Sequence, residues 1–245
     1  MQCDSPKVVL PVADRPMIWW IVRACRDAGI SRCIVVVGYR GQEVRQVLAD
    51  EPACVFVEQH EQLGTGHAVR MAQPLFDDNN LSPLLVLPGD APLITPKTLL
   101  RLLKVHRQTN AAASVATAEL DNPFGYGRVI RDRKGAFQAI VEHKDATESQ
   151  KRVREINTGY YCFRSDLLFA SLSRVSDVNA QGEYYLTDVP GLLRTSGKNV
   201  AVLNRVAPEE IMGVNDATQL AEVDQILRAR LDGNGATHNR EKESE

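Results

Sequence analysis

The sequence predicts an α/β fold in which helices pack on both faces of a largely parallel sheet. In the first 110 residues, short apolar runs alternate with amphipathic helical patterns, which gives the order βαβαβα. Runs such as residues 33–37 and 84–87 contain no charged or hydroxyl side chain, which is typical of strands buried on both faces. After residue 110 the pattern changes to shorter strands and a hairpin, so we expect a second lobe packed against the first.

The elements of the first half follow from periodicity. A helix is expected over residues 17–28, because apolar side chains recur at helical spacing between Pro16 and Gly29, a typical start and stop. The other helices of this half are expected over residues 42–48, 68–75 and from 95–96 to 106, and the strands over 33–37, 54–57 and 84–87.

The second half begins with a predicted strand and a hairpin. The turn sequence at residues 132–135 separates two alternating segments, 127–131 and 137–142. Further strands are expected over residues 112–118, 156–163 and 199–203, and helices over 165–172, 184–193 and 217–231. No Pro-, Ser- or Gly-rich linker separates the halves, so we expect one domain over residues 1–231 and a disordered charged tail over 232–245.

Composition argues against several classes of function. The 29 Lys and Arg nearly cancel the 31 Asp and Glu, so no overall field attracts nucleic acid or an anionic membrane. No apolar run approaches the roughly 18 residues of a membrane-spanning helix. Acidic Asp4 and the lack of an apolar leader argue against a secretory signal, so we expect a cytoplasmic location. The five cysteines form no C-x-x-C pair, which argues against a disulfide framework or a structural zinc site.

Ligands of open α/β sheets bind beyond the carboxyl ends of the strands, where three polar segments are expected: 38–41, 59–67 and 87–93. In the third segment, Asp90 follows a buried strand and a glycine. Its carboxylate could hold a divalent cation, or it could be only a turn or N-cap residue. We favour the cation, because prolines flank Asp90 and no helix begins before Thr95.

The second segment contains two glycines, Gly64 and Gly66, just before a helix. Glycines let the backbone approach a ligand closely, but they also serve tight turns, and on the glycines alone we favour the turn. The polar side chains of Gln59, Gln62 and Thr65 beside them indicate a recognition loop.

Four further positions have two possible interpretations, one functional and one purely structural. Lys7 lies between prolines and apolar residues and could neutralise a phosphate, although a lone lysine is more often solvated. Residues 125–129 could be only a hairpin turn, and Glu142 could belong to a solvated face. Asn157 interrupts an alternating strand against strand propensity, so we expect it to be functional.

Taken together, eight segments in order along the chain resemble one family, the uridylyltransferase domain of bacterial bifunctional N-acetylglucosamine-1-phosphate uridylyltransferase / glucosamine-1-phosphate acetyltransferase. The segments are SPKVV (5–9), EQLGTGHA (61–68), GDAPLI (89–94), GYGR (125–128), VEHKDAT (141–147), EINTG (155–159), NAQGEYYLTD (179–188) and GVN (213–215). Each is weak alone, but eight in order are a specific signal.

The resemblance implies a Rossmann-like nucleotidyltransferase fold of the GT-A type, with a mixed sheet, flanking helices and a smaller sugar-binding lobe. It implies that Lys7 contacts the nucleotide phosphates and, with Asp90, forms the catalytic pair. It implies that Gln59, Gly64 and Thr65 recognise the uracil ring and that Asp90 and Asn215 bind Mg²⁺. The amino sugar would be bound by the backbone of Gly127 and by Glu142 and Asn157. The backbone around Pro88 and Gly89 would contact the nucleoside. Proline has no N–H to donate, so Pro88 departs from that last role.

The implied reaction joins UTP and N-acetylglucosamine 1-phosphate to give UDP-N-acetylglucosamine, a cell-wall precursor, and pyrophosphate. A sugar-phosphate oxygen attacks the α-phosphorus and pyrophosphate leaves in line, so no protein nucleophile is required. Positioning and charge neutralisation by Mg²⁺ and Lys7 would supply the catalysis.

The chain departs from the family pattern at both ends. Met1 aligns with the methionine that ends the family's glycine-rich phosphate loop, so the loop and the first, central strand are missing. We expect a hydrophobic slot and unpaired backbone groups in their place. The hexapeptide repeats of the acetyltransferase are also missing, so we expect no acetylation of glucosamine 1-phosphate.

Two alternatives stay open at this stage. The chain could be a nucleotidyltransferase for another base or another sugar 1-phosphate, which product analysis would separate. It could instead be a non-catalytic protein that binds nucleotide sugars. The sequence does not predict an oligomeric state.

We predict that a form extended by upstream codons, encoding the strand and phosphate loop, turns over far faster than the 245-residue chain. The reason is that the loop would cradle the triphosphate with backbone N–H groups. A pyrophosphate-release assay of the two forms tests this, and equal turnover would contradict it.

Overall fold

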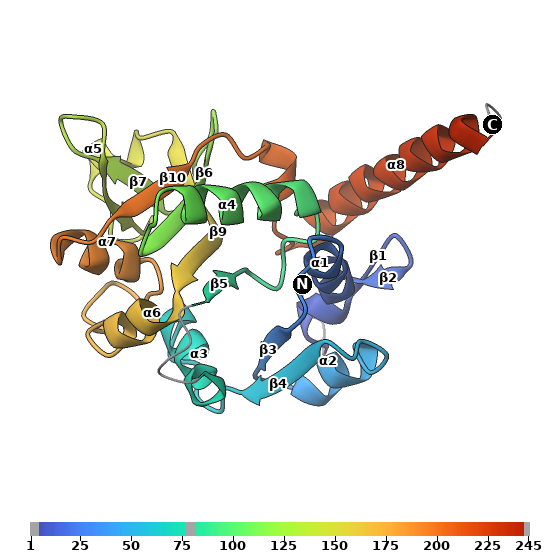
Figure 1. Cartoon of the computed structure of the whole chain (residues 1–245), viewed down its shortest axis with the longest axis horizontal. Coiled ribbons are helices and arrows are strands. Elements are labelled where there is room, and N and C mark those ends of the chain that lie inside the picture. The colour runs from blue at the N-terminus through green and yellow to red at the C-terminus, as the bar shows by residue number, and fades with distance from the viewer. Residues whose placement is uncertain (1–4, 77–81, 243–245) are drawn as a thin grey trace.

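The computed structural model describes residues 5–76 and 82–242, and it has a mixed α/β fold with helices on both sides of a mixed sheet (Figure 1). The strands are β1 Pro11–Val12, β2 Arg15–Pro16, β3 Cys33–Val37, β4 Cys54–Glu58, β5 Pro83–Val86, β6 Ala113–Glu119, β7 Arg128–Arg131, β8 Phe137–Val141, β9 Glu155–Arg164 and β10 Val200–Leu203. The helices are α1 Met17–Asp27, α2 Gly41–Val47, α3 Thr65–Met71, α4 Pro96–Gln108, α5 Glu148–Lys151, α6 Ser165–Leu172, α7 Asp188–Thr195 and α8 Ala217–Lys242, with 3-10 turns η1 Lys7–Val9, η2 Gln73–Leu75 and η3 Pro208–Ile211. The mixed sheet implied by the resemblance is confirmed. The largely parallel sheet expected from the periodicity is wrong for the described residues, because β5, β6 and β7 each pair antiparallel with β9, and β7 pairs antiparallel with β8.

The six-stranded sheet is organised around β9. Strand β6 pairs antiparallel with β9 along one edge, and β10 adds a parallel strand beyond β6. The other edge of β9 is divided: β5 pairs with residues 161–164 and β7 pairs at residue 156. Residues 158–160, between them, have no strand partner on this edge within the described residues. This unpaired stretch of β9 lies next to the loop that follows β5.

Alternate residues of β9 enter two hydrophobic cores. Tyr160 and Cys162 pack with α1, α2 and α4 on one face of the sheet. Tyr161 and Phe163 pack with β8, α6 and α7 on the other face. This alternation is the period of two of a β-strand, so a single strand carries both cores.

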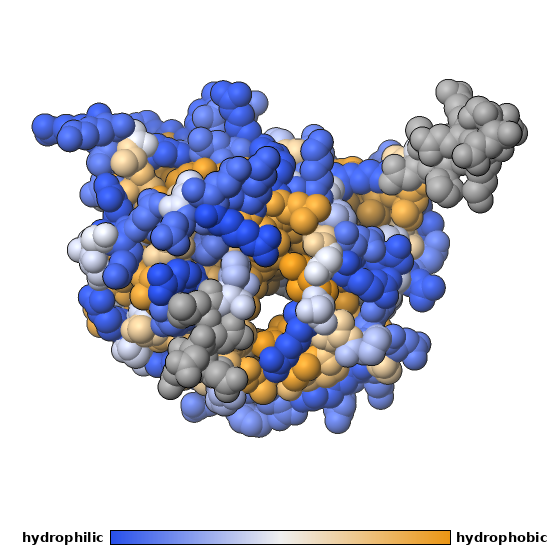
Figure 2. Space-filling model, in the orientation of Figure 1, coloured by the Kyte–Doolittle hydropathy of each residue, from blue (hydrophilic) through white to orange (hydrophobic). Residues whose placement is uncertain are grey.

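The two strands β3 and β4 form a separate parallel pair. In the described part of the chain no strand bridges β3 and β5, and Figure 2 shows an opening through the molecule there, bordered largely by hydrophobic residues. This opening lies between β3 and β5. It explains a difference from expectation: four of the five residues of β3 are only partly buried, not buried on both faces.

Local signals account for most element boundaries. Helix α4 begins where expected, because the Thr95 side chain accepts a hydrogen bond from the Thr98 N–H and Pro96 occupies the first turn. Helix α7 begins at Asp188 and not at residue 184 as predicted. The reason is tertiary, since the backbone N–H and C=O of Tyr184 bond to Leu63 and Gly66 and not to a helix.

The C-terminal tail differs from its prediction. Helix α8 continues to Lys242, eleven residues past the expected end at Leu231, so residues 232–242 are helical rather than disordered. No proline interrupts residues 217–242, which lets the backbone hydrogen bonds continue. Figure 1 shows this helix projecting from the body of the protein. The last three residues of the predicted tail, 243–245, lie outside the described residues.

No helix among the described residues combines the length and the apolar character that crossing a membrane requires.

Candidate active site

Three of the predicted site residues converge at the end of β5. The ammonium nitrogen of Lys7 lies 2.5 Å from Oδ2 of Asp90 and donates to Oδ1 of Asn215 at 2.9 Å. These residues come from η1, from the loop after β5 and from the loop before α8, and Lys7 and Asn215 are 208 positions apart. The fold therefore assembles a cation between two oxygen donors from distant parts of the chain.

Backbone contacts hold this cluster together. The Val214 N–H donates to the carbonyl of Asp90 at 3.1 Å, which places the neighbouring Asn215 beside the carboxylate. A Cβ atom on Gly89 would lie 3.5 Å from Cγ1 of Val8, so the loop after β5 packs directly against η1. The positions of Lys7, Asp90 and Asn215 thus depend on backbone contacts more than on their own side chains.

The donor atoms suit a hard divalent cation. A carboxylate oxygen and an amide oxygen contact the same nitrogen, so they lie close enough to bind one ion, and both are oxygen donors of the kind that Mg²⁺ prefers. No group of three or more His, Cys, Asp or Glu within the described residues is arranged to hold a metal. A cation here would complete its shell with waters and phosphate oxygens, as Mg²⁺ usually does.

A second group contains Gly127, Glu142 and Asn157. A Cβ atom on Gly127 would lie 3.4 Å from Oε2 of Glu142, and the carbonyl of Gly127 accepts the N–H of Asn157 at 2.9 Å. Burial raises the pKa of Glu142, and the nearby carboxylates of Asp145 and Asp188 raise it further. The three residues predicted to hold the sugar are therefore neighbours around a carboxylate that water only partly reaches.

This second group adjoins the Lys7 cluster through Pro88. A Cβ atom on Gly159 would lie 3.5 Å from Cγ of Pro88, so the loop after β5 touches β9 where the edge of β9 lacks a strand partner. The ring of Pro88 thus packs against β9, while Gly89 leads to Asp90. The predicted phosphate and sugar residues form one continuous surface.

The predicted base-recognition loop has a structural reason for its glycines that sequence reasoning missed. Cβ atoms on Gly64 and Gly66 would lie 2.8 Å and 2.9 Å from the carbonyl oxygen of Tyr184. The Gly66 N–H donates to that oxygen, and the Thr65 hydroxyl accepts the Leu186 N–H at 3.1 Å. The glycines are required by the approach of protein backbone, whatever ligand binds beside them.

Gln59 is oriented within the same loop. Its Nε2 donates to the carbonyl of Gly64 at 3.1 Å and lies 3.0 Å from Nδ1 of His67. The amide nitrogen is thus directed into the protein. The carbonyl oxygen is left to accept a hydrogen bond from a ligand.

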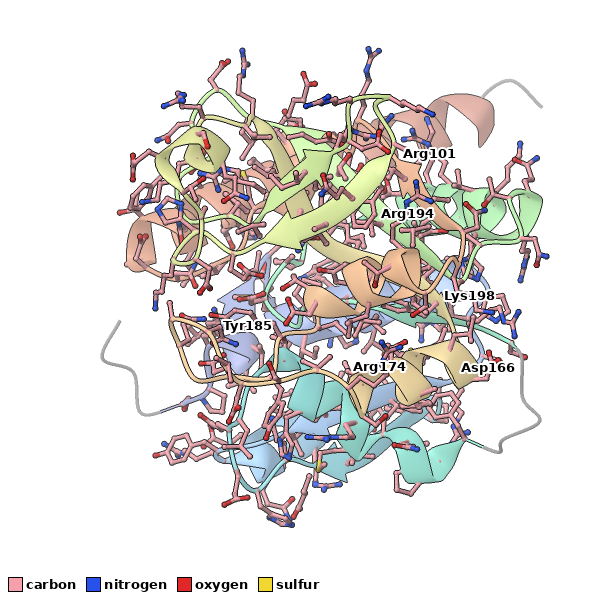
Figure 3. The ribbon with its side chains drawn as sticks, turned by 90° about the vertical axis from the view of Figure 1, so that its left-hand side faces the viewer. Arg101, Asp166, Arg174, Tyr185, Arg194 and Lys198 are labelled. Carbon is pink, nitrogen blue, oxygen red and sulfur yellow. The ribbon has the colours of Figure 1, made fainter. Side chains whose placement is uncertain are left out.

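The segment 179–187 joins the base loop to the sugar group. Tyr185, labelled in Figure 3, lies in the loop between α6 and α7 and donates its hydroxyl to Asp145 at 3.2 Å. Lys144 donates to Gln181 at 2.5 Å, and Asn179 closes the loop by donating to the carbonyl of Glu183 at 2.6 Å. This loop therefore docks on the residues that follow Glu142.

Arg128 is a residue whose role the sequence did not reveal. Its side chain is 1% exposed, and it donates to the carbonyl of Tyr126 and, at 3.4 Å, to that of Lys151. Desolvation lowers its pKa. The buried guanidinium fixes the backbone that presents Gly127. The one available signal was an arginine next to the apolar Val129 in a predicted strand.

A cavity of about 360 Å³ lies on another face, between β8, α7 and the start of the loop that follows α6. Arg174, at its rim, is labelled in Figure 3, and Thr187 and Asp188 also line it. None of the eleven predicted site residues lines this cavity.

Comparison with known proteins gives a family model that matches residues 1–157, described as a MobA-like NTP transferase domain. The chain is 47% identical over 231 residues to the Bifunctional protein GlmU of Heliobacterium modesticaldum and 45% identical over 231 residues to that of a Geobacillus species. Each match covers 94% of this chain and 50% of the relative, so the chain spans about half the length of the curated relatives it matches.

Among solved structures, the chain is similar to the crystal structure of a UDP-glucose pyrophosphorylase complexed with UDP-glucose, with a TM-score of 0.73 and 17% identity. The likeness covers 92% of this chain and 91% of that one. An apo structure of UDP-glucose pyrophosphorylase matches equally well, at 16% identity. At these identities the likeness supports the fold alone.

We predict that Glu142→Gln stabilises the protein at neutral and alkaline pH. The pKa of Glu142 is raised in the folded protein, so the protonated carboxyl favours folding more than the charged carboxylate does. The stability that the protonated carboxyl contributes is lost as the pH rises through this raised pKa. The Tm of Glu142→Gln should rise by about 2–4 °C at pH 8 and by less at pH 4. Glu148→Gln is the control, since Lys151 lowers the pKa of the exposed Glu148, and it should give no gain. Equal shifts at both pH values would contradict the prediction.

We predict that Gly66→Ala destabilises the protein by about 1–3 kcal/mol, because the new methyl group would meet the backbone of Tyr184. Gly191→Ala is a matched control in helix α7, where the nearest atom lies at an ordinary 3.9 Å. It should be neutral or stabilising by up to about 1 kcal/mol. Urea unfolding measures both, and equal effects of the two variants would refute the close-approach argument.

Proposed function

We propose that this chain, which belongs to the family of MobA-like NTP transferase domains, transfers the uridylyl group of UTP to N-acetylglucosamine 1-phosphate and releases pyrophosphate. The observation that carries the proposal is the convergence of Lys7, Asp90 and Asn215 beside the Gly127, Glu142 and Asn157 group. A cation-binding group thus adjoins a partly buried carboxylate suited to sugar hydroxyls. Similarity to proteins named Bifunctional protein GlmU supports the choice of substrates.

In the proposed reaction, an oxygen of the sugar phosphate attacks the α-phosphorus of UTP. The bond from the α-phosphorus to the bridging oxygen breaks, and the electron pair leaves with pyrophosphate. The nucleophile is already an anion, so no side chain has to remove a proton or form a covalent intermediate. The residues have to align the two phosphates and neutralise their charge.

Lys7 is the group proposed to neutralise the phosphates. In the structure, Asp90 and Asn215 accept hydrogen bonds from the Lys7 ammonium, which therefore occupies the point between the two oxygens. A bound Mg²⁺ would replace the ammonium at these oxygens, and Lys7 would then turn its N–H donors to the phosphate oxygens. Mg²⁺ held by Asp90 and Asn215 would neutralise charge on the phosphates and on the leaving pyrophosphate.

The sugar would lie against Gly127, Glu142 and Asn157. The absence of a side chain at Gly127 leaves room beside the Glu142 carboxylate, where sugar hydroxyls can donate. Because this carboxylate is partly desolvated, its hydrogen bonds to a ligand would be stronger than those of a solvated carboxylate.

The uracil ring would lie against Gln59, Gly64 and Thr65. The orientation of Gln59 leaves its carbonyl oxygen to accept the imide N–H of uracil. Cytosine has no N–H at that ring position, so the same acceptor would disfavour it. Pro88 and Gly89 would contact the nucleoside between the base and the phosphates.

We propose the cytoplasm as the site of the reaction. Cys25, Cys33, Cys54 and Cys162 are all free thiols in the structure, which suits a reducing compartment.

The test measures pyrophosphate release across the four nucleoside triphosphates and several sugar 1-phosphates with Mg²⁺ present. UTP with N-acetylglucosamine 1-phosphate should be the best pair. Asp90→Ala should lower the rate by about 100-fold or more. Asp121→Ala should not change the rate, since that carboxylate is 96% exposed and pairs only with Arg154 among the described residues.

Direct binding of UDP-N-acetylglucosamine, measured by calorimetry, gives a second readout that does not require turnover. Preference for another nucleotide or sugar, or unaltered activity of Asp90→Ala, would show that the proposal is wrong.

A further inference from the structure

Strand β9 carries two adjacent tyrosines that are buried on opposite faces. Tyr160 is 1% exposed and donates its hydroxyl to the carbonyl of Glu210. Tyr161 is 2% exposed, and its hydroxyl oxygen accepts a hydrogen bond from Nδ2 of Asn157 at 2.6 Å. The two residues are alike in type, strand and burial, but the hydroxyl of Tyr161 bonds to a predicted sugar-binding residue, whereas that of Tyr160 bonds to a backbone carbonyl outside the predicted site residues.

A regular strand would not allow the contact between Tyr161 and Asn157. Residues four apart on a strand are separated by about 13 Å, at roughly 3.3 Å per residue. Here Tyr161 pairs with Val115 and Asn157 pairs with Thr117, so four steps on β9 match two steps on β6. The bulge shortens the separation to about 7 Å and keeps both side chains on one face.

The bulge is stabilised by local hydrogen bonds. Gly159 has φ +80°, a conformation that favours glycine, and its N–H donates to Oδ1 of Asn157 at 3.2 Å. Thr158 donates its hydroxyl to the carbonyl of Ala116 at 2.9 Å and accepts the N–H of Tyr160 at 3.2 Å. The side chain of Asn157 is therefore an integral part of the bulge.

These contacts determine which way the Asn157 amide faces. A backbone N–H can only donate, so the atom of Asn157 that contacts Gly159 must be the oxygen. The nitrogen then faces Tyr161, and its second hydrogen stays available for a ligand. Rotation of the amide by 180° would break the bond from Gly159 and direct the amide oxygen at the tyrosine hydroxyl.

We propose that Tyr161 is a positioning residue, which, together with the Gly159 N–H that sets the direction of the amide, holds the side chain of Asn157 in the place that binds the sugar of the substrate. The inference rests on the proposed function, because it assigns Asn157 to the sugar. Tyr161 itself need not touch the ligand. Burial raises the pKa of Tyr161, and the nearby charge of Glu142 adds to the effect, so the hydroxyl stays neutral across the working pH range.

The experiment compares Tyr161→Phe with Tyr160→Phe in the full chain. Each variant removes one buried hydroxyl and one hydrogen bond, so both should lose similar stability. Tyr161→Phe should weaken binding of UDP-N-acetylglucosamine about fivefold to tenfold, which is the size expected for one oriented hydrogen bond. Tyr161→Phe should change the affinity for UTP by less than twofold. Tyr160→Phe should change the affinities for UTP and for UDP-N-acetylglucosamine by less than twofold each.

Two further readouts separate positioning from general damage. The side-chain NH₂ resonances of Asn157 in a ¹⁵N NMR spectrum should move in Tyr161→Phe and stay in place in Tyr160→Phe. In an Asn157→Ala background, Tyr161→Phe should cause little further loss of sugar-nucleotide affinity, because its effect acts through the amide.

The outcomes distinguish this inference from the proposed function. If the wild-type chain does not bind UDP-N-acetylglucosamine, the proposed function fails and the inference fails with it. If the wild type binds and the two tyrosine variants behave alike, only the inference is overturned. Equal weakening of UTP and UDP-N-acetylglucosamine by Tyr161→Phe would also overturn it, since that pattern indicates a general structural effect.

Discussion

The division of one edge of β9 is the constraint on which the rest of the structure depends. Strands β5 and β7 occupy the two ends of that edge, and the bulge at residues 158–160 lies between them. A continuous partner strand would cover Asn157 and would keep the loop after β5 away from the sugar group. Because the edge is interrupted, Pro88 touches β9 at Gly159. This contact links the loop that carries Asp90 to the strand that carries Asn157.

The charges around this interval contribute little to the stability of the fold. Lys7 holds two oxygen donors together in a partly exposed position, where an ion pair contributes little to folding. Glu142 is partly desolvated among other carboxylates, which disfavours its charged form. Arg128 is buried, and its guanidinium contacts two carbonyl oxygens and the ring of His143 rather than a carboxylate within the described residues. The rigid sheet allows these unfavourable charges to persist at the site.

Much of the fold could be predicted from local sequence, and so could the residues proposed for the site. The strand at 33–37 and the helix at 165–172 have the predicted bounds, because their apolar patterns and flanking residues are local signals. Asn157 was identified because it contradicts strand propensity, and the bulge explains the contradiction. The start of helix α7 was predicted wrongly, and the close approach of Tyr184 to Gly64 and Gly66 was not predicted. Both depend on a contact between segments about 120 residues apart.

The sequence by itself determined which residues can do the chemistry: a lysine between prolines, an aspartate after a buried strand, and an asparagine within a strand. It also determined the alternation of helices and strands, since periodicity is a property of neighbouring residues. Only the tertiary structure decided that Lys7, Asp90 and Asn215 share one point and that Tyr161 accepts a hydrogen bond from Asn157. These contacts depend on register and on loop docking, and no short stretch of sequence encodes the position of a residue 208 places away.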